Sequence, residues 1–336
     1  MKKISIVIPT FNETGNVDTV FDRVAKVFET SLADFDYDIW FLDNHSQDST
    51  YDEILTLAAR EDRVRGVRYV RNFGFQRSLM TGYRLVDGDA IVQLDCDLQD
   101  PPELIPEMVA HWSKGHDLVF GVREKRPEGF VQAFLRRSFY RTLARISSDF
   151  VPENAGDFRL TDRSLIEKLR RVNDLDPYVR GLISSMSRNP TGISYERARR
   201  AHGRSKFPFF RQMGFALSGI ASHSVLPLRI ASLFGAVVLV FTVGLMAFYL
   251  VGAVFGDLDW PAGLMTMLLL LLLSISFNCF FFGIIGEYLA HIHQNTRARP
   301  LAIIEKTVNV GGDIDTLERE TWSGAATTKN ALDRLG

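Results

Sequence analysis

Residues 90–102, AIVQLDCDLQDPP, place an apolar run directly before three aspartates and two prolines. The run is typical of a short buried strand, and Asp95 and Asp97 lie two residues apart, so in extended geometry their side chains point to one side. Two like charges held together are costly unless a positive charge lies between them. Mg²⁺ shares oxygen ligands with substrate phosphates, and Gln99 offers a further amide oxygen. A D-x-D pair also recurs by chance in solvated loops, so its position after a strand is what favours a metal site.

Strand and helix signals alternate on both sides of this stretch. The predicted strands are residues 4–8, 38–42, 67–70, 90–94 and 117–121. The predicted helices are residues 16–30, 51–60 and 75–86, followed by one that opens at Pro101 and Pro102. This alternation predicts an α/β fold with a mostly parallel sheet covered on both faces.

Polar groups follow three of the predicted strands. Ligands bind such sheets at the carboxyl ends of the strands, where PTFNE (9–13), Asp43 and the acid cluster would share one rim. The chain has neither G-x-G-x-x-G nor a P-loop, which argues against a dinucleotide enzyme or an ATPase. A nucleotide at this rim would therefore be held by a metal and by arginines. The formal net charge is −1, and the charged residues are distributed unevenly along the chain. We predict no nucleic-acid partner.

Residues 230–255 and 260–286 contain no charged side chain. Each stretch exceeds the ~20 apolar residues that cross a bilayer as a helix. We predict two transmembrane helices; the alternative is a pair of buried core helices. The intervening GDLDW (256–260) has no Lys or Arg, whereas arginines flank both stretches on their outer sides, so both termini are predicted to face the cytoplasm.

Two basic segments accompany the predicted spans. Residues 130–147 alternate apolar and arginine positions, which is typical either of a helix on an anionic membrane or of one packed on the sheet. Residues 195–212 are basic and aromatic and precede the first span, which favours the membrane surface. The predicted domains are a catalytic domain (1–206), a juxtamembrane amphipathic segment (207–229), the two spans and a cytoplasmic tail (287–336).

Six motifs in order carry a family resemblance: SIVIPTFNE, FLDNHSQDST, RNFGFQRSLMTG, QLDCDLQDPPELIPEM, AGDFRLTDR and GRSKFPF. Together they resemble the family 2 glycosyltransferases that load a sugar onto a polyprenyl phosphate, such as dolichol-phosphate mannose synthases and bacterial prenyl-phosphate glucosyltransferases. The resemblance covers roughly residues 3–305, and IIGEYLAHI (284–292) is similar to the bacterial branch. One departure is Asn44, where the family commonly has a second acid after Asp43.

The resemblance implies a GT-A fold and an inverting, metal-dependent transfer from a nucleotide sugar, UDP-linked as in most two-span bacterial relatives. It assigns Asp157 and Asp97 to catalysis, and Mg²⁺ or Mn²⁺ to Asp95, Asp97 and Gln99. The nucleotide-sugar residues that it implies are Pro9, Phe11, Glu13, Asp43, Asp95 and Arg123. The residues that it implies for binding the acceptor phosphate are Arg200, Ser205 and Lys206. The acceptor implied is a lipid such as undecaprenyl phosphate, in the bacterial inner membrane, and a homo-oligomer is suggested by relatives only.

Several alternatives stay open at this point. GDP-mannose is the alternative donor. A processive glycosyltransferase would want more than two spans, and a nucleotidyltransferase would want a basic Gly-rich loop that PTFNETGN (9–16) does not provide. Asn44 leaves room for a decayed, membrane-anchored nucleotide-sugar-binding protein. Without the surrounding AGDFR motif, Asp157 would be interpreted as a helix cap or as an acidic residue in a loop. The sugar itself cannot be read from the sequence.

Overall fold

The computed structural model describes residues 1–123, 155–172, 174, 177–196, 237, 240, 241, 244, 251, 263–296 and 300–312. The chain forms two compact units, which are described separately. One unit comprises Met1–Ser205 together with Ala298–Gly336, and the other comprises Lys206–Arg297. The site lies in the first unit.

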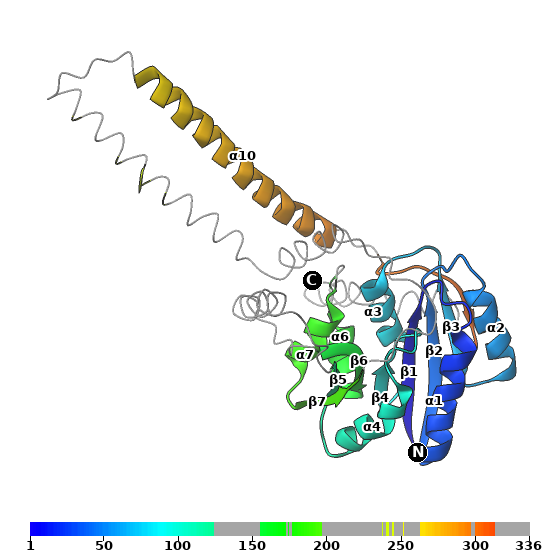
Figure 1. Cartoon of the computed structure of the whole chain (residues 1–336). Helices are drawn as coiled ribbons and strands as arrows, with labels where there is room; N and C mark the ends of the chain where they lie inside the picture. The colour runs from blue at the N-terminus through cyan, green and yellow to red at the C-terminus, as the bar shows by residue number, and fades with distance from the viewer. Residues whose placement is uncertain are drawn as a thin grey trace, which may run out of the picture. The chain divides into compact units, whose positions relative to one another are not determined.

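The first unit contains an eight-stranded sheet in the order β7-β5-β6-β4-β1-β2-β3-β8 (Figure 1). The strands are β1 (Lys2–Thr10), β2 (Phe35–Asp43), β3 (Val64–Tyr69), β4 (Ala90–Gln93), β5 (Leu118–Arg123), β6 (Ala155–Asp162), β7 (Pro190–Tyr195) and β8 (Ile304–Val308). β1 pairs in parallel with β2 and β4, as do β2 with β3 and β5 with β7. β6 and β8 pair antiparallel to their neighbours, so the sheet is mixed and mostly parallel.

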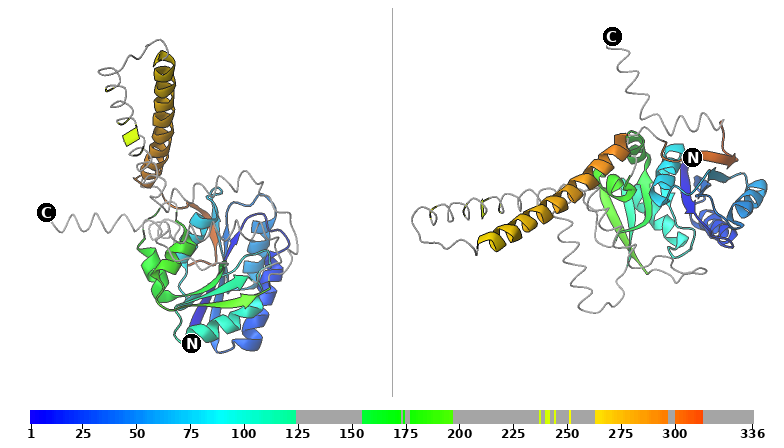
Figure 2. Two further views of the ribbon diagram at one scale, coloured as in Figure 1. Left: turned by 60° about the vertical axis from the view of Figure 1, so that its left-hand side comes forward. Right: turned by 90° about the horizontal axis from the view of Figure 1, so that it is seen from above.

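Helices cover both faces of this sheet (Figure 2). α1 (Val17–Ser31), α2 (Thr50–Arg60) and α4 (Ile105–Ser113) contribute to one apolar core, with the short helix η1 (Pro102–Leu104) leading into α4. α3 (Phe75–Leu85), α6 (Arg163–Arg170) and α7 (Val179–Met186) contribute to the other. α1 illustrates the cause, because Val17, Val20 and Val24 recur at helical spacing and are fully buried.

The predicted strand and helix alternation of the first 120 residues is confirmed, with small shifts at the ends. The strand before the acid cluster ends at Gln93, one residue earlier than predicted. The sequence reasoning did not predict β6, β7 or β8. β6 lies between β4 and β5 and runs antiparallel to both. No local sequence pattern predicts this position, because it depends on partners that are distant along the chain.

The stretch after residue 287, predicted as a tail, contributes β8 to the sheet. β8 pairs antiparallel with β3 and forms the sheet edge (Figure 2). Ile304 and Leu301 are buried in the core formed with α3. Residues 304–308 therefore belong to the same sheet as the first strand of the chain.

The second unit contains α10 (Gly263–Thr296). Among the helices of the described residues, none is found that combines the length and the apolar character needed to cross a membrane. Most of the first predicted span (230–255) and the basic helix (130–147) lie outside the described residues. The two spans therefore stay a prediction.

Candidate active site at the carboxyl ends of β1, β2 and β4

The loops after β1 and β2 are joined into one wall of the rim. Thr10 is in register with Asp43 at the ends of the two strands, and the Asn44 amide donates to the Thr10 carbonyl at 2.9 Å. The Asn12 amide donates to Ser46 Oγ at 2.9 Å. The PTFNE and DNHS stretches thus lie side by side because main-chain groups of one loop are satisfied by the other.

Three rim loops each hold a non-glycine residue with positive φ. These residues are Asn12 (56°), His45 (62°) and Leu98 (56°), one in each loop after β1, β2 and β4. The left-handed conformation costs a non-glycine residue roughly 1–2 kcal/mol. Such strain persists where the surrounding structure imposes it, and it gathers at functional sites. Its recurrence at one end of the sheet singles out this rim.

The acid cluster is shaped by a turn, which corrects the extended geometry expected from the sequence. β4 ends at Gln93, and Cys96 and Asp97 lie in a turn. Asp97 Oδ1 accepts from the Gln99 amide at 3.1 Å, closing a local loop. The alternation of side chains along a strand therefore does not decide where Asp95 and Asp97 point.

Negative charge accumulates around Asp95. The pKa of Asp95 is raised to about 7, first by burial and then by the charges of Asp157, Asp100 and Asp97, against the opposing effect of Arg123. The Asp95 side chain is only half-buried, so a bound cation could reach it. No three His, Cys, Asp or Glu side chains in the described part of the chain are arranged to enclose a metal ion by themselves.

Asp100 lies at the base of this cluster and is fully buried. Its Oδ1 accepts from the Tyr195 hydroxyl at 2.5 Å, and its Oδ2 lies 3.6 Å from an Arg123 nitrogen. Arg123 Nε also donates to the Tyr195 oxygen at 3.4 Å. The ends of β5 and β7 therefore attach Arg123 to the acid loop, beside the end of β4.

Asp157, on β6, is held by two guanidinium groups. Arg180 donates from Nε to Oδ1 at 3.1 Å and from its terminal nitrogen to Oδ2 at 2.6 Å, a bidentate pair. Arg159 reaches Oδ1 at 3.7 Å. Burial would raise the pKa of Asp157, but Arg180, Arg159 and Arg123 together lower it. Asp157 is therefore ionised at neutral pH and is a weak proton acceptor.

Asp43 is fully buried at the end of β2. Its Oδ1 accepts from the Ser46 amide at 3.1 Å, and its Oδ2 lies 3.4 Å from Arg68 without accepting a hydrogen bond within the described ranges. Burial raises the pKa of Asp43, against the hydrogen bonds from Ser46 and the charge of Arg68. One carboxylate oxygen beside the rim thus keeps capacity to accept.

The loop after β1 brings the remaining predicted residues to the same rim. Phe11 is exposed, with 41% of its surface accessible. Glu13 accepts from the Asn16 side-chain amide at 2.8 Å, and its own main-chain amide donates to Thr50 Oγ1 at 2.8 Å. Pro9 is half-buried beside Leu42. These contacts attach the loop to the start of α2.

Comparisons with known proteins show the family of this chain. The family described as "Glycosyl transferase family 2" matches residues 5–170. The chain is 32% identical to the bactoprenol glucosyl transferase of Shigella phage SfX over 306 residues, which cover 90% of this chain and 99% of that protein. The chain belongs to glycosyl transferase family 2.

This family 2 glycosyltransferase has further relatives. It is 32% identical to the uncharacterized glycosyltransferase YkcC of Bacillus subtilis over 309 residues, 91% of this chain and 94% of that one. Among solved structures, glucosyl-3-phosphoglycerate synthase of Mycobacterium tuberculosis aligns with a TM-score of 0.45 at 20% identity, covering 66% of this chain and 78% of that chain. The mostly parallel α/β sheet is the GT-A fold expected from the resemblance.

Of the predicted site residues in this glycosyltransferase, the structure describes the nucleotide and acid-loop residues and Asp157. Arg200, Ser205 and Lys206, predicted to hold the acceptor phosphate, lie outside the described residues. The residues that sequence reasoning gave no role at the site are Asp100, Arg159, Arg180, Tyr195 and Arg68. Asp100 belongs to the acid cluster and could have been found there, whereas Arg180 has no local signal.

Asn44 departs from the family's acid pair and has a structural use. Its Oδ1 accepts from the Phe73 amide at 2.9 Å, which connects the loop after β2 to the loop after β3. Asn44 is buried, so this contact replaces water that the amide would otherwise need. The substitution leaves the neighbouring Asp43 at its strand end.

Proposed function

We propose that this glycosyltransferase transfers a hexose, with inversion, from a UDP-sugar to a polyprenyl phosphate such as undecaprenyl phosphate. The observation that carries the proposal is the group of carboxylates and arginines at the rim. Asp95 is influenced by the charges of Asp157, Asp97 and Arg123, and Arg180 holds Asp157. Support for the acceptor comes from relatives whose names state bactoprenol as their substrate. The product would be a lipid-linked sugar for cell-envelope glycan or lipid modification.

The donor set of the acid loop fits a divalent cation. Asp95, Asp97 and Gln99 offer only oxygen ligands, and the raised pKa of Asp95 reflects, after burial, an excess of neighbouring negative charge. Two carboxylates with an amide leave coordination positions for phosphate oxygens, as Mg²⁺ and Mn²⁺ sites in nucleotide enzymes commonly require. Bound there, the cation would neutralise charge on the departing nucleoside diphosphate.

The chemistry left to the protein is positioning. The acceptor phosphate forms a bond to the anomeric carbon as the bond to the nucleoside diphosphate breaks. A phosphate monoester has a second pKa of about 6, so it is already largely ionised near neutral pH and needs little base assistance. Asp157, ionised and held by Arg180, then acts by orienting rather than by removing a proton. Arg123, beside Asp100, is available to the diphosphate.

The proposed location is the cytoplasmic face of a bacterial inner membrane. This part of the proposal is supported by residues 230–255 and 260–286, which contain no charged side chain. The acceptor phosphate lies at the bilayer surface, so a catalytic unit that must reach it gains from being held there. Homo-oligomerisation is proposed by analogy with relatives only.

A donor screen tests this function. Purified full-length protein in detergent, with undecaprenyl phosphate and Mn²⁺ or Mg²⁺, is given each common UDP- or GDP-sugar, and nucleotide release is followed. Release that requires one donor, the lipid and the metal would support the proposal and name the sugar. Release with a GDP-sugar alone would replace the UDP donor, and nucleotide binding without release under any condition would indicate a decayed enzyme.

Asp97→Asn provides the matching variant. It keeps the side-chain volume and the hydrogen bond from Gln99 but removes a charge from the proposed metal site. We expect metal-dependent release to fall at least ~100-fold, the scale of losing one electrostatic group in a preorganised site, with an unchanged melting temperature. Asp34→Asn, at an exposed turn, is the control. Near-wild-type turnover of Asp97→Asn would remove the metal from the mechanism.

A further inference from the structure

The edge strand β8 carries a bulge at Glu305. β8 pairs with β3 in a register that passes from Arg68 opposite Lys306 to Tyr69 opposite Ile304. Glu305 is therefore the extra residue, with no partner of its own in the ladder. A bulge re-aims the side chain that it carries and is common beside active sites. Here it directs a carboxylate from residue 305 toward β3.

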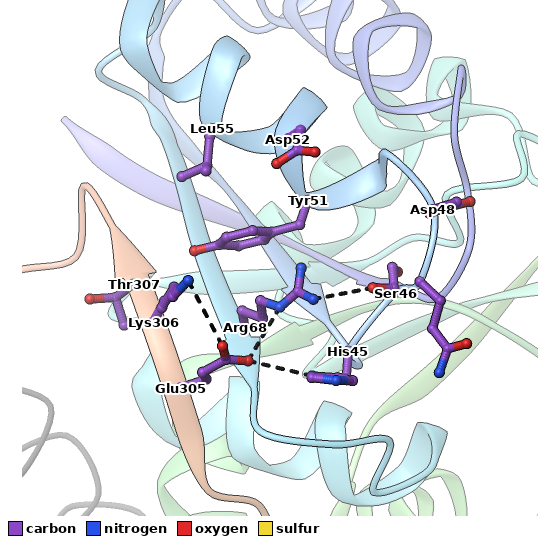
Figure 3. Close-up of a pocket in the computed structure, with 11 residues that line it drawn as sticks. His45, Ser46, Asp48, Tyr51, Asp52, Leu55, Arg68, Glu305, Lys306 and Thr307 are labelled. Carbon is purple, nitrogen blue, oxygen red and sulfur yellow. Dashed lines mark hydrogen bonds and ion pairs between the residues drawn. The ribbon is translucent and has the colours of Figure 1, made fainter.

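Glu305 meets Arg68 in a pocket of about 700 Å³ between α2, β3 and β8 (Figure 3). Its Oε2 lies 3.3 Å from Arg68 Nε and 3.4 Å from His45 Nδ1. The His45 nitrogen is also 3.0 Å from the Tyr69 carbonyl, which can only accept, so this nitrogen carries the proton. One carboxylate on β8 thus contacts a residue of β3 and a residue of the loop after β2.

Arg68 in turn faces the rim. Its NH1 lies 3.4 Å from Asp43 Oδ2, and its NH2 donates to the Ser46 carbonyl at 3.2 Å. Its guanidinium lies 4.8 Å from the centre of the Tyr51 ring. Arg68 is thus shared between two carboxylates, and it approaches Asp43 without giving Oδ2 a hydrogen bond.

We propose that Glu305 is a positioning residue for the nucleotide site: by holding the Nε edge of Arg68, it prevents the guanidinium from closing onto Asp43. Asp43 Oδ2, buried and without a hydrogen bond among the described residues, then keeps its capacity to accept from a donor group of the base or ribose. The inference rests on the proposed function, in which Asp43 contacts the nucleotide. It makes the C-terminal strand part of donor recognition, although residue 305 lies 262 positions along the chain from Asp43.

The competing explanation is a surface ion pair that only fastens the edge strand. Glu305 and Arg68 are 32% and 19% exposed at their side chains. Exposed pairs contribute ~0–1 kcal/mol to stability. A pair that only fastens the edge strand would not change the affinity for the nucleotide. The two explanations separate in ligand affinity, because only a positioning role acts through Asp43.

The test measures UDP binding in the presence of Mn²⁺ by calorimetry on full-length protein, with turnover as a second readout. Glu305→Gln keeps the shape and removes the charge, which frees Arg68 to hydrogen-bond Asp43. We expect the Kd for UDP and the KM for the donor to rise ~3–10-fold, a change of about 1 kcal/mol, with kcat within about twofold. Glu167→Gln is the control, because Glu167 has the same contact with Arg163 at 3.2 Å on α6.

A double-mutant cycle provides the decisive comparison. If Glu305 acts through Asp43, adding Glu305→Gln to Asp43→Asn changes the Kd no further. Unchanged UDP affinity in Glu305→Gln, or effects that multiply in the double variant, would overturn the inference while leaving the proposed function intact. A wild-type protein that binds neither UDP nor GDP would overturn both.

Discussion

Arg180 is the partner on which the charge of Asp157 depends most, so Arg180→Met is the most informative perturbation of the site. Methionine keeps an unbranched apolar stem but removes both hydrogen bonds, at 3.1 and 2.6 Å. Arg180→Lys is the companion variant, because it keeps the positive charge and loses the planar fork. Arg159, at 3.7 Å, remains beside Asp157 in both variants.

The size of the effect follows from burial. The side chains of Arg180 and Asp157 are 26% and 22% exposed, so solvent screens the pair only in part. A hydrogen bond to a charged group contributes ~1.5–3 kcal/mol when buried. Allowing for screening and for Arg159, we expect a loss of about 2–3 kcal/mol, or roughly 4–12 °C in a domain of this size.

The pH dependence has a definite sign. The folded-state pKa of Asp157 is lowered, so the pair stabilises the fold above the unfolded-state pKa of about 3.9 and loses that contribution as the pH falls through the folded pKa. The difference in melting temperature between wild type and Arg180→Met should therefore be largest at pH 7 and shrink below about pH 5. In the variant the pKa of Asp157 rises, so the acid limb of the kcat/KM profile should move to higher pH.

The assay is thermal unfolding of both variants and wild type across this pH range, together with the pH profile of turnover. Arg180→Lys should retain part of the stability, and the acid limb of its kcat/KM profile should stay close to the wild-type pH. Equal melting temperatures of wild type and Arg180→Met at pH 7 would refute the reasoning that the Arg180–Asp157 pair stabilises the fold. A stability loss with an unmoved acid limb would show that the ionisation of Asp157 does not matter for turnover.

Two further substitutions test one contact at the site, around Asp100, and one at the opposite, amino ends of β5 and β7. Tyr195→Phe removes the hydroxyl that donates to buried Asp100 and accepts from Arg123, and we expect a loss of about 1–3 kcal/mol in a thermal melt; an unchanged midpoint would argue that water replaces the hydroxyl. Asp117→Asn weakens the acceptor for Ser187 Oγ and for the amides of Arg188 and Asn189. Burial alone would raise the pKa of Asp117, but these hydrogen bonds lower it, so the stability difference from wild type should be present at pH 7 and fade as the pH falls below about 4. A difference that grows on acidification would contradict this assignment.

The sequence by itself determined the alternation of the first 120 residues, because buried strands and amphipathic helices leave periodic apolar signals that local chemistry fixes. The spacing of Val17, Val20 and Val24 predicted α1, and the apolar run before Asp95 predicted β4. The gathering of polar groups at the strand ends was equally predictable, because parallel strands share one carboxyl edge.

Only the tertiary structure decided the partners of those groups. Arg180 reaches Asp157 across 23 positions, Tyr195 reaches Asp100 across 95, and Glu305 reaches Arg68 across 237. None of these pairs has a local signature, since each depends on which elements become neighbours in the fold. The Glu305–Arg68 pair depends in addition on the bulge in β8. The extended geometry that the spacing of the aspartates predicted is likewise replaced by a turn at Asp97, because β4 ends at Gln93, before the first of the two aspartates.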